Sequence, residues 1–325
     1  MWGAILEKAF AKLHGNYEHL IGGDPREASR SLTGSPSLQY VHTKPDIDVD
    51  FIWQELIKHD TNNEMMFLQT PTIEGSEVND CGLQTGHAYV VLEAKELSNG
   101  AKVVKMRNPW AQERYSCDYS DDSNKWTNRL REEAGATDIA VNEGIFFMTV
   151  DDYFEQGQVT VISYDTTDWY HSYFLKLDDE TDSPGSWSWC GATCTRHTLE
   201  VTSDAAQPVF VTAHTWDARS YPDECRAENK AHSIYLEGDR NIALFKEGTT
   251  QLLPIDFKPG ETKKFIVEWD WARENITPDW SLTAWAEKGD VTVKHAAGLT
   301  TDTLPFVERR AAEETVSASN SKGTA

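Results

Sequence analysis

His87, Asn108 and Trp110 are the residues whose types and spacing could do chemistry together. His87 lies in Gly86-His87-Ala88-Tyr89, and Asn108 follows about twenty residues later, with Trp110 two positions on. An imidazole can take the proton of a thiol and stay charged beside the thiolate, while an asparagine oxygen accepts from the other ring nitrogen and fixes the ring. An indole over that bond would shield it from water and strengthen it. The pattern indicates the base and the orienting group of a site that needs a thiol nucleophile.

Two predicted strands must position these side chains. Apolar, β-rich runs cover residues 88–92 and 103–106, and the turn residues Ser98-Asn99-Gly100 separate them. His87 precedes the first run and Asn108 follows the second. We therefore expect an antiparallel strand pair to bring the two side chains together.

The elements around this strand pair are predicted to be mixed. An amphipathic helix is indicated by apolar residues at helical spacing, namely Trp2, Ile5, Leu6, Ala9, Phe10 and Leu13. Asp24-Pro25 is a typical start for a short helix over 26–31, and 48–58 is a third candidate. From residue 65 onward the runs are β-rich, so this part of the chain is predicted to be α+β.

Helical patterning ends near residue 166. Short strands with glycine and proline turns follow, at 197–201, 209–214, 233–236, 242–246, 263–267 and 281–287. Regularly spaced short strands favour an antiparallel β-sandwich. The last segment, 308–325, has almost nothing to bury and is predicted to be a disordered tail. The predicted domains are therefore residues 1–164, 165–307 and the tail.

The composition argues against two kinds of partner. The chain has 325 residues with 53 acidic against 30 basic side chains, a net charge of −23 that nucleic-acid phosphates would repel. Its longest apolar stretches, such as 145–148, are far shorter than a membrane span needs. The first residues lack the pattern of a secretory signal. We expect no nucleic-acid binding, no transmembrane segment and a cytoplasmic location.

The five cysteines are predicted to be free thiols, because they are few, scattered and odd in number. A zinc site at Cys190, Cys194 and His197 is the alternative, since thiolates and imidazole are suitable ligands. The segment lacks a second ligand pair at finger-like spacing, although Cys225 or His214 could complete a tetrahedron. Buried or strand-edge thiols are the favoured interpretation.

With these motifs in order, the chain resembles the calpain family of cysteine proteases over about 300 residues. The motifs that carry the resemblance are Trp2 to Gly23, Glu27-Ala28, Leu32-Thr33-Gly34, Gly86-His87-Ala88-Tyr89, Arg107-Asn108-Pro109-Trp110, Trp126, Gly185-Ser186-Trp187, Cys190-Gly191 and Cys194. The resemblance implies a papain-like second catalytic lobe followed by the family's β-sandwich, and intracellular limited proteolysis of protein substrates. His87 would be the general base, Asn108 would orient it and Trp110 would shield their bond.

The nucleophile of such a site is missing from the expected place. In papain-like enzymes it lies roughly 130–150 residues before the histidine and opens a helix. Cys81 is the only cysteine that precedes His87 here. It is expected to lie in extended chain leading to His87 and not at the start of a helix. The chain is therefore expected to be inactive alone and to need a chain or segment carrying the catalytic cysteine. The alternative is a non-catalytic regulatory or binding module whose sandwich acts on proteins or phospholipid membranes.

Calcium is the cofactor that the resemblance implies, but the matching ligands are incomplete. Asp121 and Glu143 stand at family ligand positions, whereas Arg114 and Ile145 stand where the family has carboxylates. Calcium needs six to eight oxygens, so Ca²⁺ binding is possible but no tight site is expected in this lobe. The acidic run 178–182 could hold an ion weakly. Ala111 replaces a family glycine, which predicts an altered turn because alanine tolerates positive φ poorly.

Overall fold

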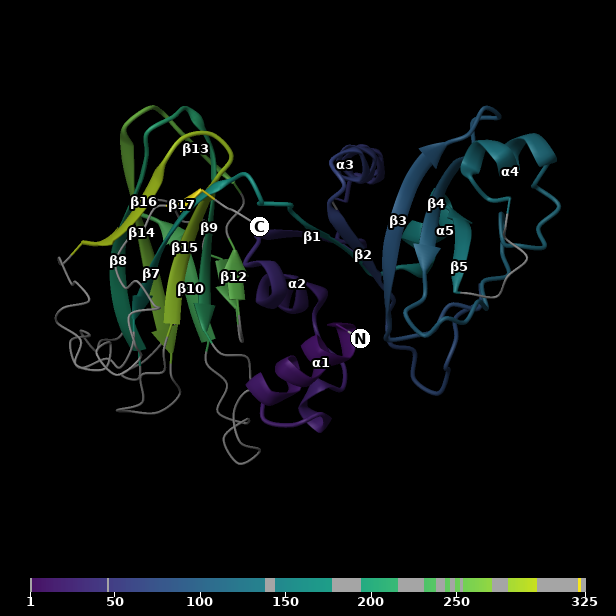
Figure 1. The fold of residues 1–325 in the computed structure, drawn as a ribbon, viewed down its shortest axis with the longest axis horizontal. Helices are drawn as coiled ribbons and strands as arrows, with labels where there is room; N and C mark the ends of the chain where they lie inside the picture. The colour runs from purple at the N-terminus through teal and green to yellow at the C-terminus, as the bar shows by residue number, and fades with distance from the viewer. Residues whose placement is uncertain are drawn as a thin grey trace. The chain divides into compact units, whose positions relative to one another are not determined.

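The computed structural model describes residues 2–45, 47–137, 144–176, 194–215, 231–237, 243–245, 249–251, 254–270, 280–296 and 321–322. The chain divides into two compact units (Figure 1). The first comprises Met1–Glu27 together with Thr166–Ala325, and the second comprises Ala28–Asp165. The described part of the chain contains no helix with the length and apolar character required to cross a membrane.

The chain opens with helices, as the sequence pattern predicts. These are α1 (Trp2–Leu13), the short 3-10 helix η1 (Glu18–Leu20) and α2 (Pro25–Thr33). Pro25 occupies the first position of α2, where its missing N–H costs no hydrogen bond. Ala11 is the buried residue of α1, and much of the apolar stripe on this helix is exposed.

The second unit is built on one antiparallel sheet of six strands, in the order β1-β6-β2-β3-β4-β5. The strands are β1 (Ser37–Val41), β2 (Met65–Gln69), β3 (Ala88–Glu96), β4 (Lys102–Arg107), β5 (Ile145–Thr149) and β6 (Val159–Ser163). Three helices accompany the sheet, namely α3 (Val49–Thr61), α4 (Asn128–Ala134) and α5 (Val150–Gln156).

Helix α3 packs on β2 and β3 (Figure 1). The helix begins at its N-cap Asp48, whose side chain accepts a hydrogen bond from the backbone N–H of Phe51 at 2.9 Å. It then buries Ile52, Trp53 and Leu56 against the strands. Each of these side chains contributes about 1.5–3 kcal/mol of transfer free energy. This packing fixes the sheet that carries His87.

The β3–β4 hairpin sets the positions of His87 and Asn108. Val90 pairs with Arg107, so the residue before β3 and the residue after β4 come to the same end of the hairpin. The neighbouring strand also holds His87, because the backbone N–H of Thr70 donates to His87 O at 2.9 Å and Thr70 Oγ1 accepts from His87 N at 3.0 Å. The predicted strand pair is confirmed.

The first unit contains two antiparallel sheets, in the orders β11-β10-β14-β8-β16 and β12-β9-β15-β7-β17, with β13 paired to β9. Their strands are β7 (Tyr170–Lys176), β8 (Cys194–Ser203), β9 (Gln207–Thr215), β10 (Ala231–Leu236), β11 (Ala243–Phe245), β12 (Thr249–Gln251), β13 (Ile255–Phe257), β14 (Glu261–Asp270), β15 (Trp280–Ala286), β16 (Val291–His295) and β17 (Ser321–Lys322).

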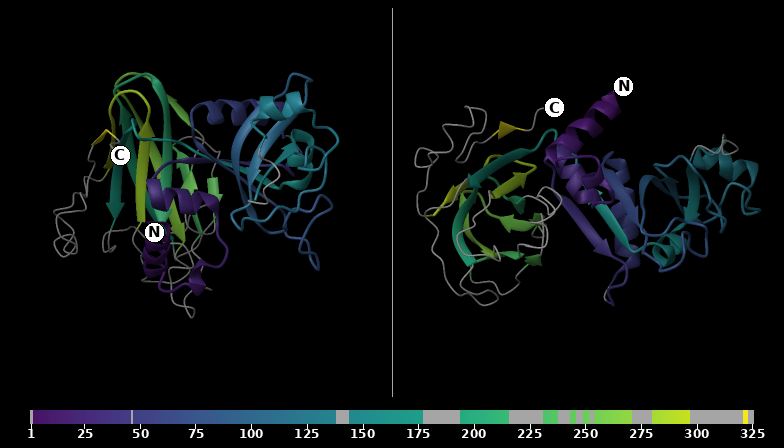
Figure 2. Two further views of the ribbon diagram at one scale, coloured as in Figure 1. Left: turned by 45° about the vertical axis from the view of Figure 1, so that its right-hand side comes forward. Right: turned by 90° about the horizontal axis from the view of Figure 1, so that it is seen from below.

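The two sheets of this unit face each other and share one core (Figure 2). Leu199 and Phe265 from one sheet pack with Val211 and Leu282 from the other, all fully buried. Antiparallel sheets joined in this way form a sandwich. The acidic run 178–182, Cys190, Cys225 and the predicted tail apart from Ser321–Lys322 lie outside the described residues.

Candidate active site

His87 and Asn108 form the hydrogen bond that their sequence positions predict. His87 Nε2 lies 2.9 Å from Asn108 Oδ1, and because the amide oxygen can only accept, the ring nitrogen donates. In the neutral ring this leaves Nδ1 as the basic nitrogen. The arrangement can therefore hold the ring in one tautomer and present Nδ1 to a proton donor.

Asn108 is itself held in place on both ends of its amide. It is buried at 3% exposure, its Nδ2 donates to Gln112 O at 2.9 Å, and its Oδ1 also accepts from the backbone N–H of Trp110 at 3.0 Å. A buried side chain with these three partners has a single favourable rotamer. The orientation of the His87 ring is thus set by a rigid group.

Two aromatic rings pack on the half-buried imidazole of His87. The Trp110 ring centroid lies 4.1 Å from that of His87, and Tyr89 meets it edge-on at 5.0 Å. Tyr89 is buried, whereas Trp110 is 60% exposed. Trp110 therefore covers one side of the imidazole while its own outer face remains in contact with solvent. The packing of Tyr89 on this ring was not predicted.

In the turn after Asn108, Ala111 adopts a positive φ, a backbone conformation that we expected alanine to avoid. Ala111 has φ of 53°, and its N–H donates to Asn108 O at 3.0 Å. Gly144 packs so closely here that a Cβ would lie 2.7 Å from Ala111 Cα, and its carbonyl accepts from Asn108 N at 2.7 Å. The prediction that alanine would avoid this conformation is wrong, because tertiary contacts offset a strain of about 1–2 kcal/mol.

Cys81 and Cys117 form a disulfide, which corrects the expectation of free thiols. Their Cα atoms are 5.3 Å apart. The bond joins the loop before His87 to the loop after Trp110. It also gives a new reason why Cys81 is not the nucleophile in this state, since its sulfur is already bonded. Cys194 is described only through its backbone, so the zinc alternative remains untested.

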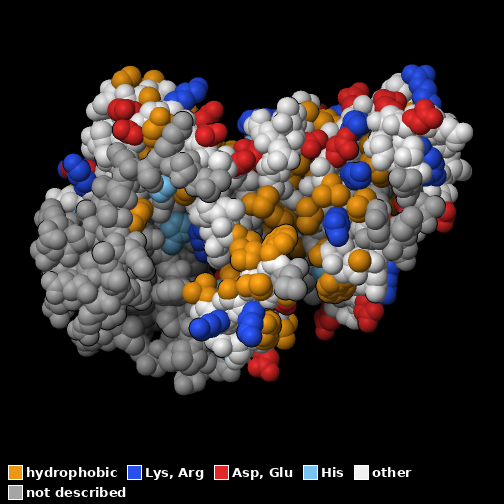
Figure 3. All heavy atoms as spheres, in the orientation of Figure 1, with side chains coloured by type: hydrophobic (Ala, Val, Ile, Leu, Met, Phe, Trp, Pro, Cys, Tyr) orange, Lys and Arg blue, Asp and Glu red, His pale blue; other side chains and the backbone are white. Residues whose placement is uncertain are grey.

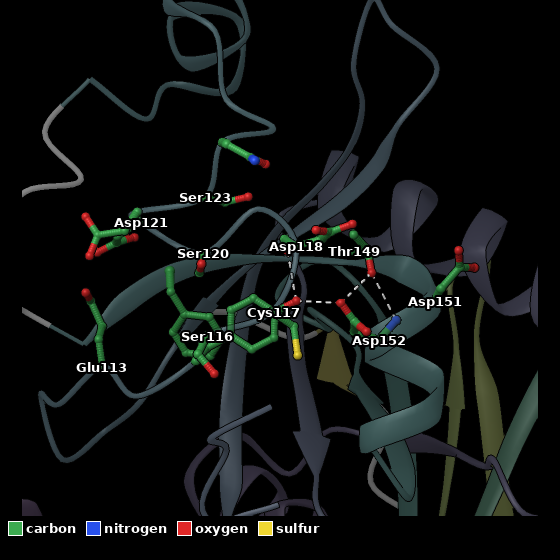
Figure 4. A pocket seen from close by; sticks show the side chains of 14 residues that line it. Glu113, Ser116, Cys117, Asp118, Ser120, Asp121, Ser123, Thr149, Asp151 and Asp152 are labelled. Atoms are coloured by element: carbon green, nitrogen blue, oxygen red, sulfur yellow. Dashed lines mark hydrogen bonds between the residues drawn. The ribbon is translucent and has the colours of Figure 1, made fainter. Parts of the chain in front are cut away.

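An acidic cavity of about 870 Å³ lies beside the disulfide (Figure 4). Six carboxyl side chains line it, namely Glu113, Asp118, Asp121, Asp122, Asp151 and Asp152. Burial and the neighbouring Asp121 raise the pKa of Glu113 to about 8. Burial and Asp122 raise the pKa of Asp121. Near neutral pH this pair holds a proton, and the cavity favours positive charge.

Of the two predicted calcium ligands, Asp121 lies within the described residues. Asp121 faces Glu113, a residue that the sequence reasoning missed. Arg114 is exposed, and Gly82 lies against its backbone carbonyl. Glu143 lies outside the described residues. The sequence contains one indication of this role for Glu113: it is an acidic residue directly before Arg114, in a segment that also contains several aspartates.

Trp126 anchors the loop that carries Asp121. Its Nε1 donates to the carbonyl oxygens of Tyr119 at 3.2 Å and Ser120 at 3.0 Å, and its ring packs with Phe147 and Leu130. A buried indole whose N–H has hydrogen-bond acceptors contributes to the core through its ring and holds the backbone segment that supplies those acceptors. The position of Asp121 is therefore set by a small separate core.

Comparisons with known proteins assign the chain to a family. The calpain-type cysteine protease ADL1 of Oryza sativa subsp. japonica is 33% identical over 158 residues, covering 47% of this chain and 7% of the relative. Human calpain-14 is 33% identical over 155 residues, covering 47% and 22%. The human calpain-1 catalytic subunit is 28% identical over 192 residues, covering 57% and 26%. The chain thus spans about a quarter or less of the length of these relatives. A sequence model of the calpain family of cysteine proteases matches residues 1–163, half of the chain, and the chain belongs to that family.

Proposed function

We propose that this chain supplies the base half of a calpain-type cysteine endopeptidase site, in a papain-like second lobe. His87 is the general base, Asn108 orients it and Trp110 shields their bond. The observation that carries the proposal is the 2.9 Å hydrogen bond from His87 Nε2 to the buried Asn108 amide. Protein substrates follow from the family.

The geometry suits proton transfer at one defined atom. With Nε2–H donated to Asn108, the lone pair of Nδ1 can accept the proton of a cysteine thiol. The resulting imidazolium stays stabilised by the Asn108 oxygen, and Nδ1–H can later protonate the leaving amine of the cleaved peptide. Cys81 and Cys117, the two cysteines whose side chains the structure describes, are joined to each other and supply no thiol in this state, so we assign the thiol to another chain or segment.

The partner that we propose is a chain or segment carrying the catalytic cysteine. The first unit offers an exposed apolar face of the kind that binds another protein segment, on α1, with Trp2 at 76%, Ile5 at 63% and Leu6 at 44% exposure. Figure 3 shows hydrophobic side chains gathered around the place of α1 in Figure 1. A contiguous exposed apolar surface is typical of an interaction site.

Calcium binding is proposed at Glu113 and Asp121 rather than at the full family ligand set. Two facing carboxyl groups whose pKa values are both raised, each first of all by burial, fit a hard cation, since the ion would replace the proton that they hold. Asp118 and Asp122 line the same cavity. Bound calcium would supply positive charge that orders this loop.

A second candidate function is a regulatory or binding module acting through its sandwich on proteins or phospholipids. The disulfide favours it, because neither cysteine whose side chain is described is a free thiol. This module would leave His87 and Asn108 without a reaction to perform. The two candidates differ in what the chain does when a thiol is supplied.

A complementation assay tests the proposed function. The chain is mixed with a separately purified fragment of the human calpain-1 catalytic subunit carrying its catalytic cysteine, in millimolar calcium and a reductant. Casein cleavage is expected from the mixture and not from either part alone. His87→Ala should abolish it, and His171→Ala, at a histidine of β7 outside the site, should leave it unchanged. If the fragment binds the chain and cleavage is absent, the binding module is the better account.

A further inference from the structure

The two sulfurs of the disulfide have a carboxylate as a close neighbour. The ligand atoms of Cys81, Cys117 and Asp152 all lie within 4.8 Å of one another. Cys81 is 4% exposed, while Cys117 and Asp152 are partly buried and line the acidic cavity (Figure 4). We propose that, once the disulfide is reduced, these three residues bind a thiophilic divalent cation of the Zn²⁺ class. This proposal does not rest on the proposed peptidase function.

The donor set suits zinc better than calcium. The two thiolates are soft ligands that suit the borderline-soft Zn²⁺ ion, which also accepts a carboxylate oxygen. Three protein ligands leave a fourth tetrahedral position for water from the cavity. Zinc–sulfur bonds of roughly 2.3 Å place two thiolates roughly 3.8 Å apart. The Cα atoms of Cys81 and Cys117 are 5.3 Å apart, so side-chain rotation alone can open the sulfurs to that spacing.

Contacts other than the disulfide hold the two cysteine loops together. The carbonyl of Cys81 accepts from Ser116 N at 3.0 Å, and Asn79 Oδ1 accepts from Cys81 N at 3.2 Å. Gly82 packs directly on the carbonyl of Arg114. Because these contacts involve the backbone, we expect the two thiols to remain neighbours after reduction.

Asp152 is oriented by two hydroxyl groups. Its Oδ2 accepts from Tyr115 Oη at 2.6 Å and from Thr149 Oγ1 at 2.8 Å, as the dashed lines in Figure 4 show. Hydrogen bonds of this kind to a ligating carboxylate fix its direction and are typical of metal sites. Asp152 lies in the first turn of α5, an element with its own N-cap at Thr149.

The charge of the cavity favours a cation over two free thiolates. Asp152 lies within 4.8 Å of both sulfurs and Asp118 lines the same cavity as Cys117, and negative neighbours disfavour thiolate formation unless a positive ion offsets them. Two thiolates and a carboxylate carry three negative charges against the two positive charges of zinc. Metal binding and disulfide formation therefore compete for the same sulfurs.

The redox step balances with a dithiol reductant. A reductant thiolate attacks Cys117 Sγ, the more accessible sulfur, and Cys81 leaves as thiolate and takes a proton. The second reductant thiol then displaces Cys117 by closing the reductant's own disulfide. The protein gains two electrons and two protons, and the dithiol loses them. Zinc then replaces the two thiol protons, which are released to solvent.

Cobalt substitution tests the site in the full chain. Cys190, Cys194 and Cys225 are changed to Ser, the protein is reduced with a phosphine that is then removed without air, and Co²⁺ is added. One equivalent should give a thiolate-to-cobalt charge-transfer band that Zn²⁺ abolishes, and the oxidised protein should give none. Asp152→Asn should weaken binding at least tenfold. Asp151→Asn, at a carboxylate of the same cavity, should change it less than twofold.

Three results would overturn the proposal. They are a reduced, folded chain without the band, a band that persists in the Cys81→Ser/Cys117→Ser variant, and equal effects of Asp152→Asn and Asp151→Asn. If the double variant does not fold, alkylation of the reduced parent protein tests metal binding instead. Zinc should slow iodoacetamide labelling of Cys81 and Cys117, as mapped by mass spectrometry. Unchanged labelling rates would contradict metal binding.

Discussion

The backbone of Gly82 lies against the carbonyl oxygen of Arg114, where a Cβ on residue 82 would be 2.0 Å from that oxygen. This close approach brings the loop before His87 onto the loop after Trp110. It allows Ser116 N to donate to the carbonyl of Cys81 and brings the two cysteines within bonding distance. Only a residue without a side chain fits here.

Gly82→Ala is therefore expected to destabilise the chain more than a positive φ alone would. Gly100 is the matched control, because its φ is 83° against 82° at Gly82 and a Cβ there would meet nothing within 4 Å. Gly100→Ala should cost about 1–2 kcal/mol in the free energy of unfolding. Gly82→Ala should cost at least about 1 kcal/mol more, from the steric clash. Equal midpoints in urea would show that the loops do not approach this closely.

The tautomer of His87 follows from its bond to Asn108. The neutral ring should carry its proton on Nε2, because that nitrogen donates to the Asn108 amide oxygen at 2.9 Å. Nitrogen-15 chemical shifts of the imidazole report this directly. Asn108→Leu should mix the tautomers and, by leaving Trp110 N without its acceptor, cost about 1–3 kcal/mol of stability. A parent protein protonated on Nδ1 would contradict the assignment.

The stability of the second unit should fall as pH rises toward 8. Glu113 has its pKa raised from 4.5 to about 8, first by burial and then by Asp121. Between these two values the folded chain holds a proton that the unfolded chain has lost, so stability decreases with pH. Solvent screening limits the effect to about 1 kcal/mol. Glu113→Gln should flatten the dependence in urea unfolding between pH 5 and pH 8.5. Glu132→Gln, at an exposed position of α4, should leave it unchanged.

Calcium should bind the Glu113–Asp121 pair weakly and only when the pair is ionised. At pH 8.5 millimolar calcium should raise the melting temperature, and at pH 6 it should not, because the shared proton then occupies the pair. Asp121→Asn should remove the shift. Asp151→Asn, at the rim of the same cavity, should preserve most of it. A shift that is equal at both pH values would place calcium elsewhere.

The sequence allowed His87 and Asn108 to be predicted as neighbours for a local reason. Two short strands joined by a turn bring the residue before the first and the residue after the second to one end of the hairpin. Helix α1 and the two-sheet unit were likewise predictable from periodicity. In each case the residues that carry the sequence pattern belong to one element or to two elements adjacent in the chain.

The disulfide and Glu113 could not be predicted in this way. Cys81 and Cys117 are 36 residues apart in loops whose approach depends on Gly82, and the small, odd number of scattered cysteines argued against a disulfide framework. The loop carrying Glu113 has no repeating structure, so the resemblance to the calpain family was the reason for placing Arg114 at a ligand position. Tertiary contacts determine which side chain faces Asp121. The same holds for Ala111, whose positive φ depends on packing against Gly144.

The measurement that tests the central claim most directly is the reactivity of the supplied thiol. The calpain-1 fragment carrying the catalytic cysteine is labelled with iodoacetamide at pH 6, with and without this chain. If His87 takes the thiol proton, the chain should accelerate labelling of that cysteine at least tenfold, since an unpaired thiol with a pKa of about 8.5 is almost entirely protonated at this pH. His87→Ala should remove the acceleration. A labelling rate that is the same with the parent chain, with His87→Ala and with no chain, in a mixture shown to be associated, would contradict the account.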